Sequence, residues 1–236
     1  MTLRVVQCPS PNHDARPEGG TIDMLVLHYT GMKTAEEALA RLCDPAAKVS
    51  AHYTIDRDGG VYAHVPEERR AWHAGVSYWA GERNVNARSI AIELVNPGRE
   101  FGYVPFTDVQ IASLIDLSHG ILARHPIPAQ RVVAHSDIAP ARKEDPGELF
   151  PWKHLADYGI GHWPDLPSGL RFTDVVDPTA DLTRYGYGLS PNMDVSLEAV
   201  ITAFQRHFRQ REVNGKWDDV CQLALAGLLT SQALSL

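Results

Sequence analysis

Three short apolar runs, separated by helical patterns, constrain the fold of this chain most strongly. Residues 22–29, 89–96 and 132–134 consist mostly of apolar side chains, as buried strands do. Between the runs, residues 34–37 and 107–110 have the capping-box pattern that opens a helix. Apolar residues at helical spacing follow each cap. Strands interspersed with helices predict an α/β fold, in which helices pack on the faces of a sheet.

Two further stretches are predicted from their turn residues. Residues 50–56 and 61–65 alternate around the turn Asp58-Gly59-Gly60, which predicts a β-hairpin. Residues 1–20 are rich in Pro, Gly, Asn and Asp, and we expect them to run over the surface as loop. Residues 66–88 have few periodic apolar positions and are predicted to form a long loop. Loops of this length without structure of their own are often functional.

The composition changes after Trp163, and this change divides the predicted domains. Residues 164–187 are rich in Pro, Gly, Asp and Thr, which is typical of a linker or an extended wrap. Two helices should follow, because apolar residues then recur at helical spacing: Leu197, Val200, Ile201, Phe204 and Phe208, then Val220, Cys221, Ala224, Leu225 and Leu228. This tail is too short for a large core of its own, so we expect it to dock on the first domain. We place the first domain at 1–163, the linker at 164–177 and the helical domain at 178–236.

Charge and cysteine content limit the partners and the compartment. The net charge of −7 argues against nucleic acid as the main partner, since binding it calls for a basic surface. The sequence has no apolar run near the ~20 residues that span a membrane, and its N-terminus lacks the apolar core of a secretory signal. Cys8, Cys43 and Cys221 are odd in number and far apart, which indicates a reducing compartment and no disulfide framework. We expect a cytosolic protein; a processed protein of the cell envelope would look the same.

Two histidines and an aspartate form a candidate metal site. His28 ends the first apolar run, His135 ends the third, and Asp145 lies in the polar loop that follows His135. Three such ligands with one open position are the arrangement of catalytic zinc. The alternatives are ordinary: either histidine can be a hydrogen-bonded core residue, and Asp145 can be a turn residue before Pro146. The spacing is a moderate signal, because the sequence has no HExxH pair.

Glu93 is a candidate general base. It interrupts the second apolar run, and Ala91 and Val95 share its face of the strand. A carboxylate among apolar neighbours has a raised pKa, which suits a base beside a catalytic zinc. The alternative is a strand with one face in solvent and an exposed Glu93.

Lys143, Trp72 and His73 complete the candidate residues. Lys143 lies two residues before Asp145, and it is either a solvated loop lysine or a cation that stabilises the oxyanion of a tetrahedral intermediate. Trp72 and His73 lie in the long loop, where aromatic side chains either pack in the ordinary way or form a platform for sugar or peptide.

Several stretches resemble one known family. Residues 28–30, 49–53, 71–75, 89–93 and 134–147 are similar, in this order, to the type 2 zinc N-acetylmuramoyl-L-alanine amidases, the AmpD/AmiD family. The resemblance implies a mixed sheet flanked by helices. It also implies zinc bound by His28, His135 and Asp145, Glu93 as the catalytic carboxylate, Lys143 stabilising the intermediate, and Trp72 and His73 on the substrate side. Residues 203–208 resemble part of an AmiD-like peptidoglycan-binding helical module.

The resemblance also implies an activity. The family hydrolyses the amide between N-acetylmuramic acid, or its 1,6-anhydro form, and L-alanine of the peptidoglycan stem peptide, in cell-wall turnover and recycling. The expected partners are muropeptides or sacculus glycan. A muropeptide-binding protein without activity is the alternative, although such relatives typically lack a zinc ligand. A lytic amidase acting on the intact sacculus is another; phage enzymes of the T7 lysozyme type have Cys where this chain has Asp145.

Overall fold

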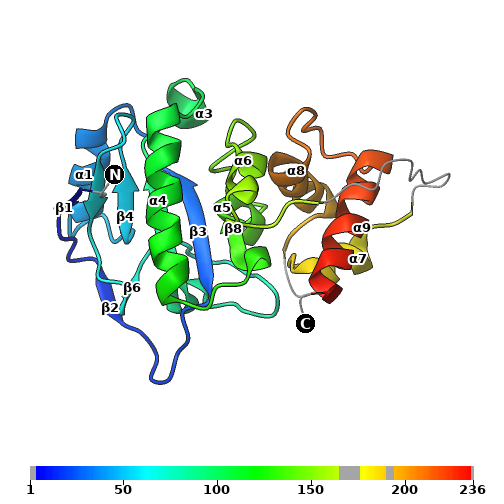
Figure 1. Ribbon diagram of the computed structural model, residues 1–236, viewed down its shortest axis with the longest axis horizontal. Helices are drawn as coiled ribbons and strands as arrows, with labels where there is room; N and C mark the ends of the chain where they lie inside the picture. Colours follow the sequence, from blue (N-terminus) through cyan, green and yellow to red (C-terminus); the bar gives the residue numbers. More distant parts are fainter. Residues whose placement is uncertain (1–3, 165–175, 190–193, 235–236) are drawn as a thin grey trace.

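A six-stranded mixed sheet forms the centre of the molecule (Figure 1). The computed structural model describes residues 4–164, 176–189 and 194–234. The strand order is β1-β5-β4-β7-β3-β8, and β4 and β5 form the antiparallel hairpin predicted from the sequence, whereas the other pairs are parallel. The strands are β1 (Val5–Gln7), β3 (Met24–Tyr29), β4 (Tyr53–Ile55), β5 (Val61–Ala63), β7 (Ser89–Leu94) and β8 (Val132–Ala134). The predicted α/β fold with a mixed sheet is confirmed.

Both capped helices form where the sequence predicts them. Helix α1 (Ala35–Cys43) begins after Thr34, whose side chain accepts a hydrogen bond from the Glu37 backbone N–H. Helix α4 (Asp108–Arg124) begins after Thr107, which accepts from Gln110 in the same way. Figure 1 shows α4 lying across one face of the sheet. Its apolar side chains share a core with the central strands, including Leu25, Leu27, Ile92, Ile111, Leu114 and Ile121.

The prediction of loop was wrong for parts of two stretches. Residues 1–20 contain β1 and β2 (His13–Ala15), and residues 66–88 contain β6 (Arg69–Ala71) and α2 (Val85–Arg88). Strands β2 and β6 pair as a separate antiparallel sheet. An ion pair between Arg70 and Asp14, 2.6 Å apart, links them. Strands of three residues with polar side chains have no apolar alternation, so the sequence gives no signal for them.

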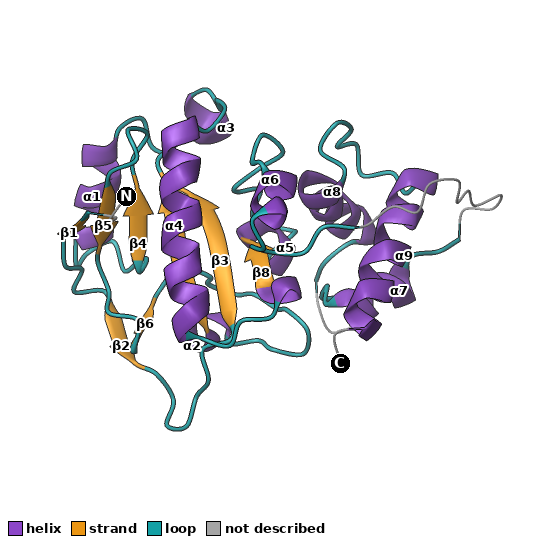
Figure 2. Ribbon diagram, viewed as in Figure 1, coloured by secondary structure: helices purple, strands orange, loops and turns teal. Residues whose placement is uncertain are grey.

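The tail is helical and packs beside β8 (Figure 2). It comprises α7 (Thr179–Tyr185), α8 (Leu197–Phe208) and α9 (Asp219–Leu234). The last two were predicted, but residues 179–185 form a helix where the composition predicted linker. Most of the proposed linker, residues 165–175, lies outside the described residues. One apolar cluster joins Met24, Val26 and Val133 of the sheet to Phe204 and Leu225 of the tail. The tail therefore shares a core with the sheet, as docking requires.

The remaining helices are short. They are α3 (Gly98–Phe101), the 3-10 turn Ala129–Arg131, α5 (His135–Ile138) and α6 (Trp152–Asp157). In the described ranges, 4–164, 176–189 and 194–234, no helix is both long and apolar enough to cross a membrane.

Candidate metal centre and active site

Strand register brings the candidate residues together at one edge of the sheet. In the parallel pair of β3 and β7, His28 lies directly opposite Glu93. On the other side of β3, Leu27 lies opposite Ala134, and the next residue, His135, begins α5. Neighbouring residues in parallel strands point to the same face, so register alone places the histidines and the carboxylate side by side. His135 was predicted at a strand end and is instead the first residue of a helix.

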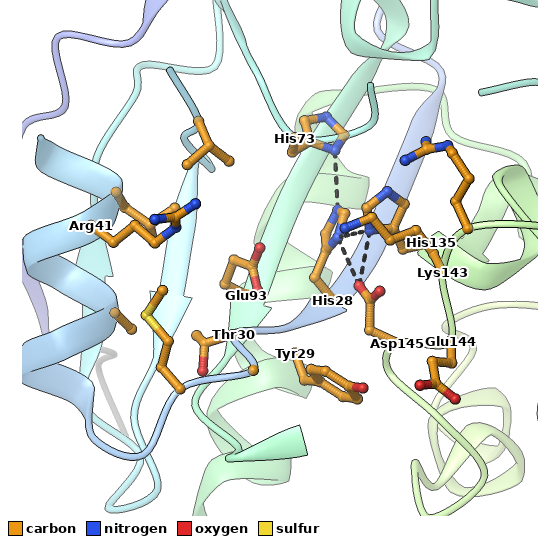
Figure 3. Close-up of a pocket in the computed structure, with 16 residues that line it drawn as sticks. His28, Tyr29, Thr30, Arg41, His73, Glu93, His135, Lys143, Glu144 and Asp145 are labelled. Atoms are coloured by element: carbon orange, nitrogen blue, oxygen red, sulfur yellow. Dashed lines mark hydrogen bonds and ion pairs between the residues drawn. The ribbon is translucent and has the colours of Figure 1, made fainter. Parts of the chain in front are cut away.

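Three ligand atoms converge in what we call the histidine cluster, formed by His28, His135 and Asp145 (Figure 3). His28 Nδ1 lies 2.9 Å from His135 Nδ1 and 3.1 Å from Asp145 Oδ2, and His135 Nδ1 lies 3.0 Å from the same oxygen. All three residues are buried. Two imidazole nitrogens and a carboxylate oxygen around one point form a possible metal site.

The protonation states also suit a metal. Burial, and then the neighbouring His135, lowers the pKa of His28 to about 4, so its ring is neutral at pH 7. Burial acts to raise the pKa of Asp145, but the two histidines outweigh it and hold that pKa well below its ordinary value. A neutral imidazole and an ionised carboxylate are the forms that bind metal ions.

A chain of hydrogen bonds fixes the ring of His28. Its Nε2 lies 3.1 Å from His73 Nδ1, His73 Nε2 lies 2.9 Å from Ser89 Oγ, and the Ser89 hydroxyl donates to the Val85 carbonyl over 2.7 Å. Because that carbonyl can only accept, we infer that each ring donates through Nε2, which leaves His28 Nδ1 unprotonated for the metal. Such contacts orient metal ligands and set their tautomer. The sequence did not indicate this role, because it depends on a loop meeting a strand.

Of the two residues predicted on the substrate side, His73 lies at the cavity and Trp72 does not. His73 lines the cavity, yet it is buried and lies beside His28 (Figure 3), so its expected contact with substrate stays a prediction. Trp72 is not among the residues lining this cavity. Its backbone N–H donates to Ser50 Oγ, and its side chain hydrogen-bonds to Asp14.

The cluster opens into a cavity of about 370 Å³. Six of the predicted residues line it: His28, His73, Glu93, His135, Lys143 and Asp145. Tyr29, Arg41 and Arg142, which the sequence did not single out, also contribute to the lining. Arg142 donates to the backbone oxygens of Ala74 and Val76, and it thereby holds residues 74–76 against the loop that carries Lys143.

Glu93 has the environment of a general base. It is half-buried, and its Oε2 is enclosed and without a hydrogen-bond partner among the described residues. Burial, and then the negative charge of Asp145, raises its pKa well above the ordinary value, whereas Lys143 acts to lower it. A carboxylate with an enclosed, unpaired oxygen in a cavity is a candidate for proton transfer, because its raised pKa makes it a better base.

The tail holds the segment that carries His135. Asp137, on the same short helix, is fully buried. Its Oδ1 accepts from the Tyr187 hydroxyl at 2.7 Å, and its Oδ2 accepts from His207 Nδ1 at 2.7 Å and from the Ala134 backbone N–H at 2.8 Å. These contacts cross 50 and 70 residues of sequence, so no local pattern indicated them. Because hydrogen bonds to a buried carboxylate are among the stronger ones, they fix α5 in place.

Comparison with known proteins identifies the family. Residues 18–148 match Amidase_2, described as N-acetylmuramoyl-L-alanine amidase. The chain belongs to this amidase family. It is 41% identical over 230 residues to N-acetylmuramoyl-L-alanine amidase AmiD of Escherichia coli K12, a match that covers 88% of this chain and 82% of AmiD. It is 38% identical to 1,6-anhydro-N-acetylmuramyl-L-alanine amidase AmpD of Enterobacter cloacae, over 62% of this chain and 86% of AmpD.

Solved structures of this amidase family extend over the tail as well. The complex of E. coli AmiD with the substrate anhydro-N-acetylmuramic acid-L-Ala-D-γ-Glu-L-Lys matches with a TM-score of 0.80 at 40% identity, covering 92% of this chain and 91% of AmiD. Pseudomonas aeruginosa AmpDh3 in complex with anhydromuramic pentapeptide also matches with a TM-score of 0.80, at 34% identity over 89% and 92% of the two chains. The expected family, fold and enzyme class are confirmed.

Proposed function

We propose that this amidase hydrolyses the amide between anhydro-N-acetylmuramic acid and L-alanine of the stem peptide, with zinc in the histidine cluster. The observation that carries the proposal is the convergence of His28 Nδ1, His135 Nδ1 and Asp145 Oδ2 within 3.1 Å of one another in a cavity. The complexes of AmiD and AmpDh3 with anhydromuramyl peptides support the substrate class.

The donor set fits zinc. Catalytic zinc has three protein ligands, commonly imidazole and carboxylate, and keeps one position open. Burial acts to raise the pKa of Asp145, but the two histidines outweigh it and hold the carboxylate ionised, and burial keeps the ring of His28 neutral. When bound, zinc supplies the Lewis acidity that polarises the carbonyl of the scissile amide.

Two residues of the cavity perform the proton and charge chemistry in this proposal. Glu93 accepts a proton from the attacking water on its unpaired Oε2 and then passes it to the leaving amine of L-alanine. Lys143 lies in the same cavity and stabilises the negative charge that develops on the carbonyl oxygen. Removal of one donor to such an oxyanion typically costs ~10²–10³ in kcat.

The activity can be tested on two substrates side by side. The zinc-loaded protein is incubated separately with sacculi and with soluble 1,6-anhydro-muropeptides, and the products are identified by mass. We expect free stem peptides beginning with L-alanine from the soluble fragments, loss of cleavage with a chelator, and recovery with zinc. Binding without cleavage would instead favour a muropeptide-binding protein, and cleavage of sacculi alone would favour a lytic amidase.

The helical tail supports catalysis indirectly in this proposal, by holding the segment of His135 through Asp137. Its predicted glycan-binding role stays a prediction, as does the cytosolic compartment. A chain truncated after residue 164 separates the two roles of the tail. We expect it to aggregate, since part of the shared apolar cluster would meet water. A folded truncated enzyme that cuts soluble muropeptides and loses only sacculus binding would support the glycan role.

A further inference from the structure

Cys8, Cys43 and His64 form a second group of ligand-type side chains, which we call the cysteine cluster. The two sulfur atoms lie 3.4 Å apart, although the residues are 35 positions apart in the sequence. Cys43 Sγ also lies 3.9 Å from His64 Nδ1. Cys8 follows β1, Cys43 ends α1 and His64 follows β5, so the cluster joins the edge of the sheet to a helix. Both cysteines are partly exposed and within reach of small solutes.

The hydrogen bonds of His64 argue against a metal in this cluster. Its Nδ1 lies 2.7 Å from the Cys8 carbonyl oxygen, which can only accept, so this nitrogen carries the proton. Its Nε2 then accepts from the Thr54 hydroxyl over 2.8 Å. Since both ring nitrogens are engaged, His64 has no lone pair to offer a metal ion. Two adjacent thiols remain as the reactive groups.

Hydrogen bonds from side chains to the backbone on both sides of Cys43 hold these two thiols together. The Ser10 hydroxyl donates to the Leu42 carbonyl over 2.5 Å, and the Asn12 side-chain amide donates to the Asp44 carbonyl over 2.8 Å. The chain after the first cysteine is thus tied to the chain on either side of the second. The two sulfurs lie 3.4 Å apart, whereas bonded sulfurs lie about 2 Å apart, so closing the bond needs only a small movement of the side chains.

We propose that Cys8 and Cys43 form a disulfide by exchange with a small-molecule disulfide such as glutathione disulfide. One cysteine thiolate attacks the reagent and releases a thiolate, which gives a mixed disulfide. The other cysteine thiolate attacks the protein sulfur of that mixed disulfide, forms the Cys8–Cys43 bond and releases the second reagent thiol. The protein loses two electrons and two protons, and the reagent is reduced to two thiols.

Two physical consequences follow. Burial, and then the nearby Cys8, raises the pKa of the Cys43 thiol to about 12, so its thiolate is scarce at neutral pH and closure is slow. The bond fastens the N-terminal segment to α1, whose Ala38, Arg41 and Leu42 line the active-site cavity. The closed form restricts the unfolded chain and raises the melting temperature, by an amount on the order of 10 °C for a chain of this size.

The test uses the full chain with zinc bound. The protein is incubated with glutathione disulfide at mildly alkaline pH, quenched in acid, unfolded with a thiol-alkylating reagent and mapped by peptide mass. We expect a Cys8–Cys43 cross-linked peptide and an alkylated Cys221, with a melting temperature higher than that of the reduced protein. Cys8→Ser and Cys43→Ser are the matched variants, and in each the oxidant should leave the melting temperature unchanged. Cys221→Ser should close as the parent does.

Three results would overturn the proposal. The first is glutathione adducts on both cysteines without closure. The second is a cross-link through Cys221. The third is a second equivalent of zinc in the parent protein that disappears in the Cys8→Ser/Cys43→Ser double variant, which would make the cluster a metal site. The first two results appear in the parent protein's own peptide masses, so they stand even where a serine variant fails to fold.

Discussion

The histidine cluster and the cysteine cluster both bring three ligand-type atoms within bonding reach of a common point, yet they differ in what those atoms already do. In the histidine cluster, His28 donates to His73 through Nε2, so its Nδ1 stays available to a metal ion. In the cysteine cluster, both nitrogens of His64 are engaged, one by a carbonyl and one by a hydroxyl. Proximity of ligand atoms is therefore a weak criterion for a metal site, and proton placement decides.

The two clusters also differ in charge and in access to substrate. Asp145 supplies a negative charge to the histidine cluster, which offsets part of the charge of a divalent ion. The pKa of the Cys43 thiol is raised, so binding a metal there would first require removal of a tightly held proton. The cavity that the histidine cluster lines is also lined by Glu93, the general-base candidate. Cys8, Cys43 and His64 are not among the residues that line this cavity.

The largest expected effect comes from removing a ligand of the histidine cluster. His135→Ala and Asp145→Ala should each lose bound zinc and reduce kcat/KM by about 10³-fold or more, because the metal supplies several kcal/mol of charge stabilisation. Zinc is measured by elemental analysis after dialysis, and turnover with anhydro-muropeptides. The matched Cys8→Ser/Cys43→Ser variant should keep one zinc per chain and full activity. Full zinc content in either ligand variant would remove that residue from the site.

Two residues of this site could be predicted from the sequence because they lie near the ends of strands with strong apolar patterns. His28 and Glu93 lie on buried strands whose register follows from the parallel pairing. What the sequence missed depends on contacts between distant segments. His73 reaches His28 across 45 residues, and His207 reaches Asp137 across 70. The contact between Cys8 and Cys43 could not be predicted for the same reason. Three widely spaced cysteines give no indication of which two lie in contact.

Weak or missing apolar patterns account for the errors at β2, β6 and α7. Strands β2 and β6 have polar side chains with intermediate or higher exposure, so they lack the alternation by which a strand is recognised. Helix α7 has buried side chains only at Leu182 and Tyr185, which is too few for a visible stripe. In each case, pairing with a partner element decides the structure, and local propensity does not.

Replacing Glu93 by glutamine should lower the activity strongly and raise the stability of the folded protein at pH 8. Glu93→Gln should lower kcat by ~10²–10⁴-fold while zinc content is unchanged. A carboxyl group whose pKa is raised on folding favours the folded state at low pH, and this advantage is lost as pH rises through the folded pKa. The metal-free glutamine variant should therefore melt higher than the metal-free parent at pH 8 and similarly at pH 4.

Activity of the parent should follow the same ionisation. Below the pKa of Glu93 its carboxyl is protonated and cannot accept a proton, so kcat falls as the pH is lowered. Glu93→Gln should lack this acidic limb in its residual activity. A folded, zinc-loaded glutamine variant with unchanged kcat would show that the base is another residue.

Lys143→Ala should lower kcat by about 10²–10³-fold, with zinc content and melting temperature close to those of the parent. The reason is loss of a positive charge beside the oxyanion. Lys153→Ala is the matched control, because Lys153 is an exposed lysine that pairs with Asp157 and lies outside the cavity lining. A rise in KM with unchanged kcat would assign Lys143 to substrate binding and not to the intermediate.

His73 contacts a metal ligand, His28, and His73→Ala tests what that contact contributes. The variant should lose about 10–100-fold in zinc affinity, because His28 loses the partner that sets its tautomer. Competition with a chromophoric chelator measures the affinity, and Ser89→Ala should show a smaller change in the same direction. Unchanged zinc affinity combined with weaker substrate binding would instead confirm the substrate role first expected for His73.

The smallest effect on the reaction is expected at His64, a residue of the cysteine cluster. His64→Ala removes the hydrogen bonds that the ring makes to the Cys8 carbonyl and to the buried Thr54 hydroxyl, which costs about 1–3 kcal/mol of stability. For a chain of this size the melting temperature should fall by roughly 2–10 °C. Zinc content and kcat should not change, since His64 touches neither the histidine cluster nor its cavity.

The control for removing an imidazole is His154→Ala, because His154 is an exposed histidine. If His64→Ala lost the zinc while His135→Ala kept it, the assignments of the two clusters would have to be exchanged, because the metal would then depend on the ring whose nitrogens we take to be engaged.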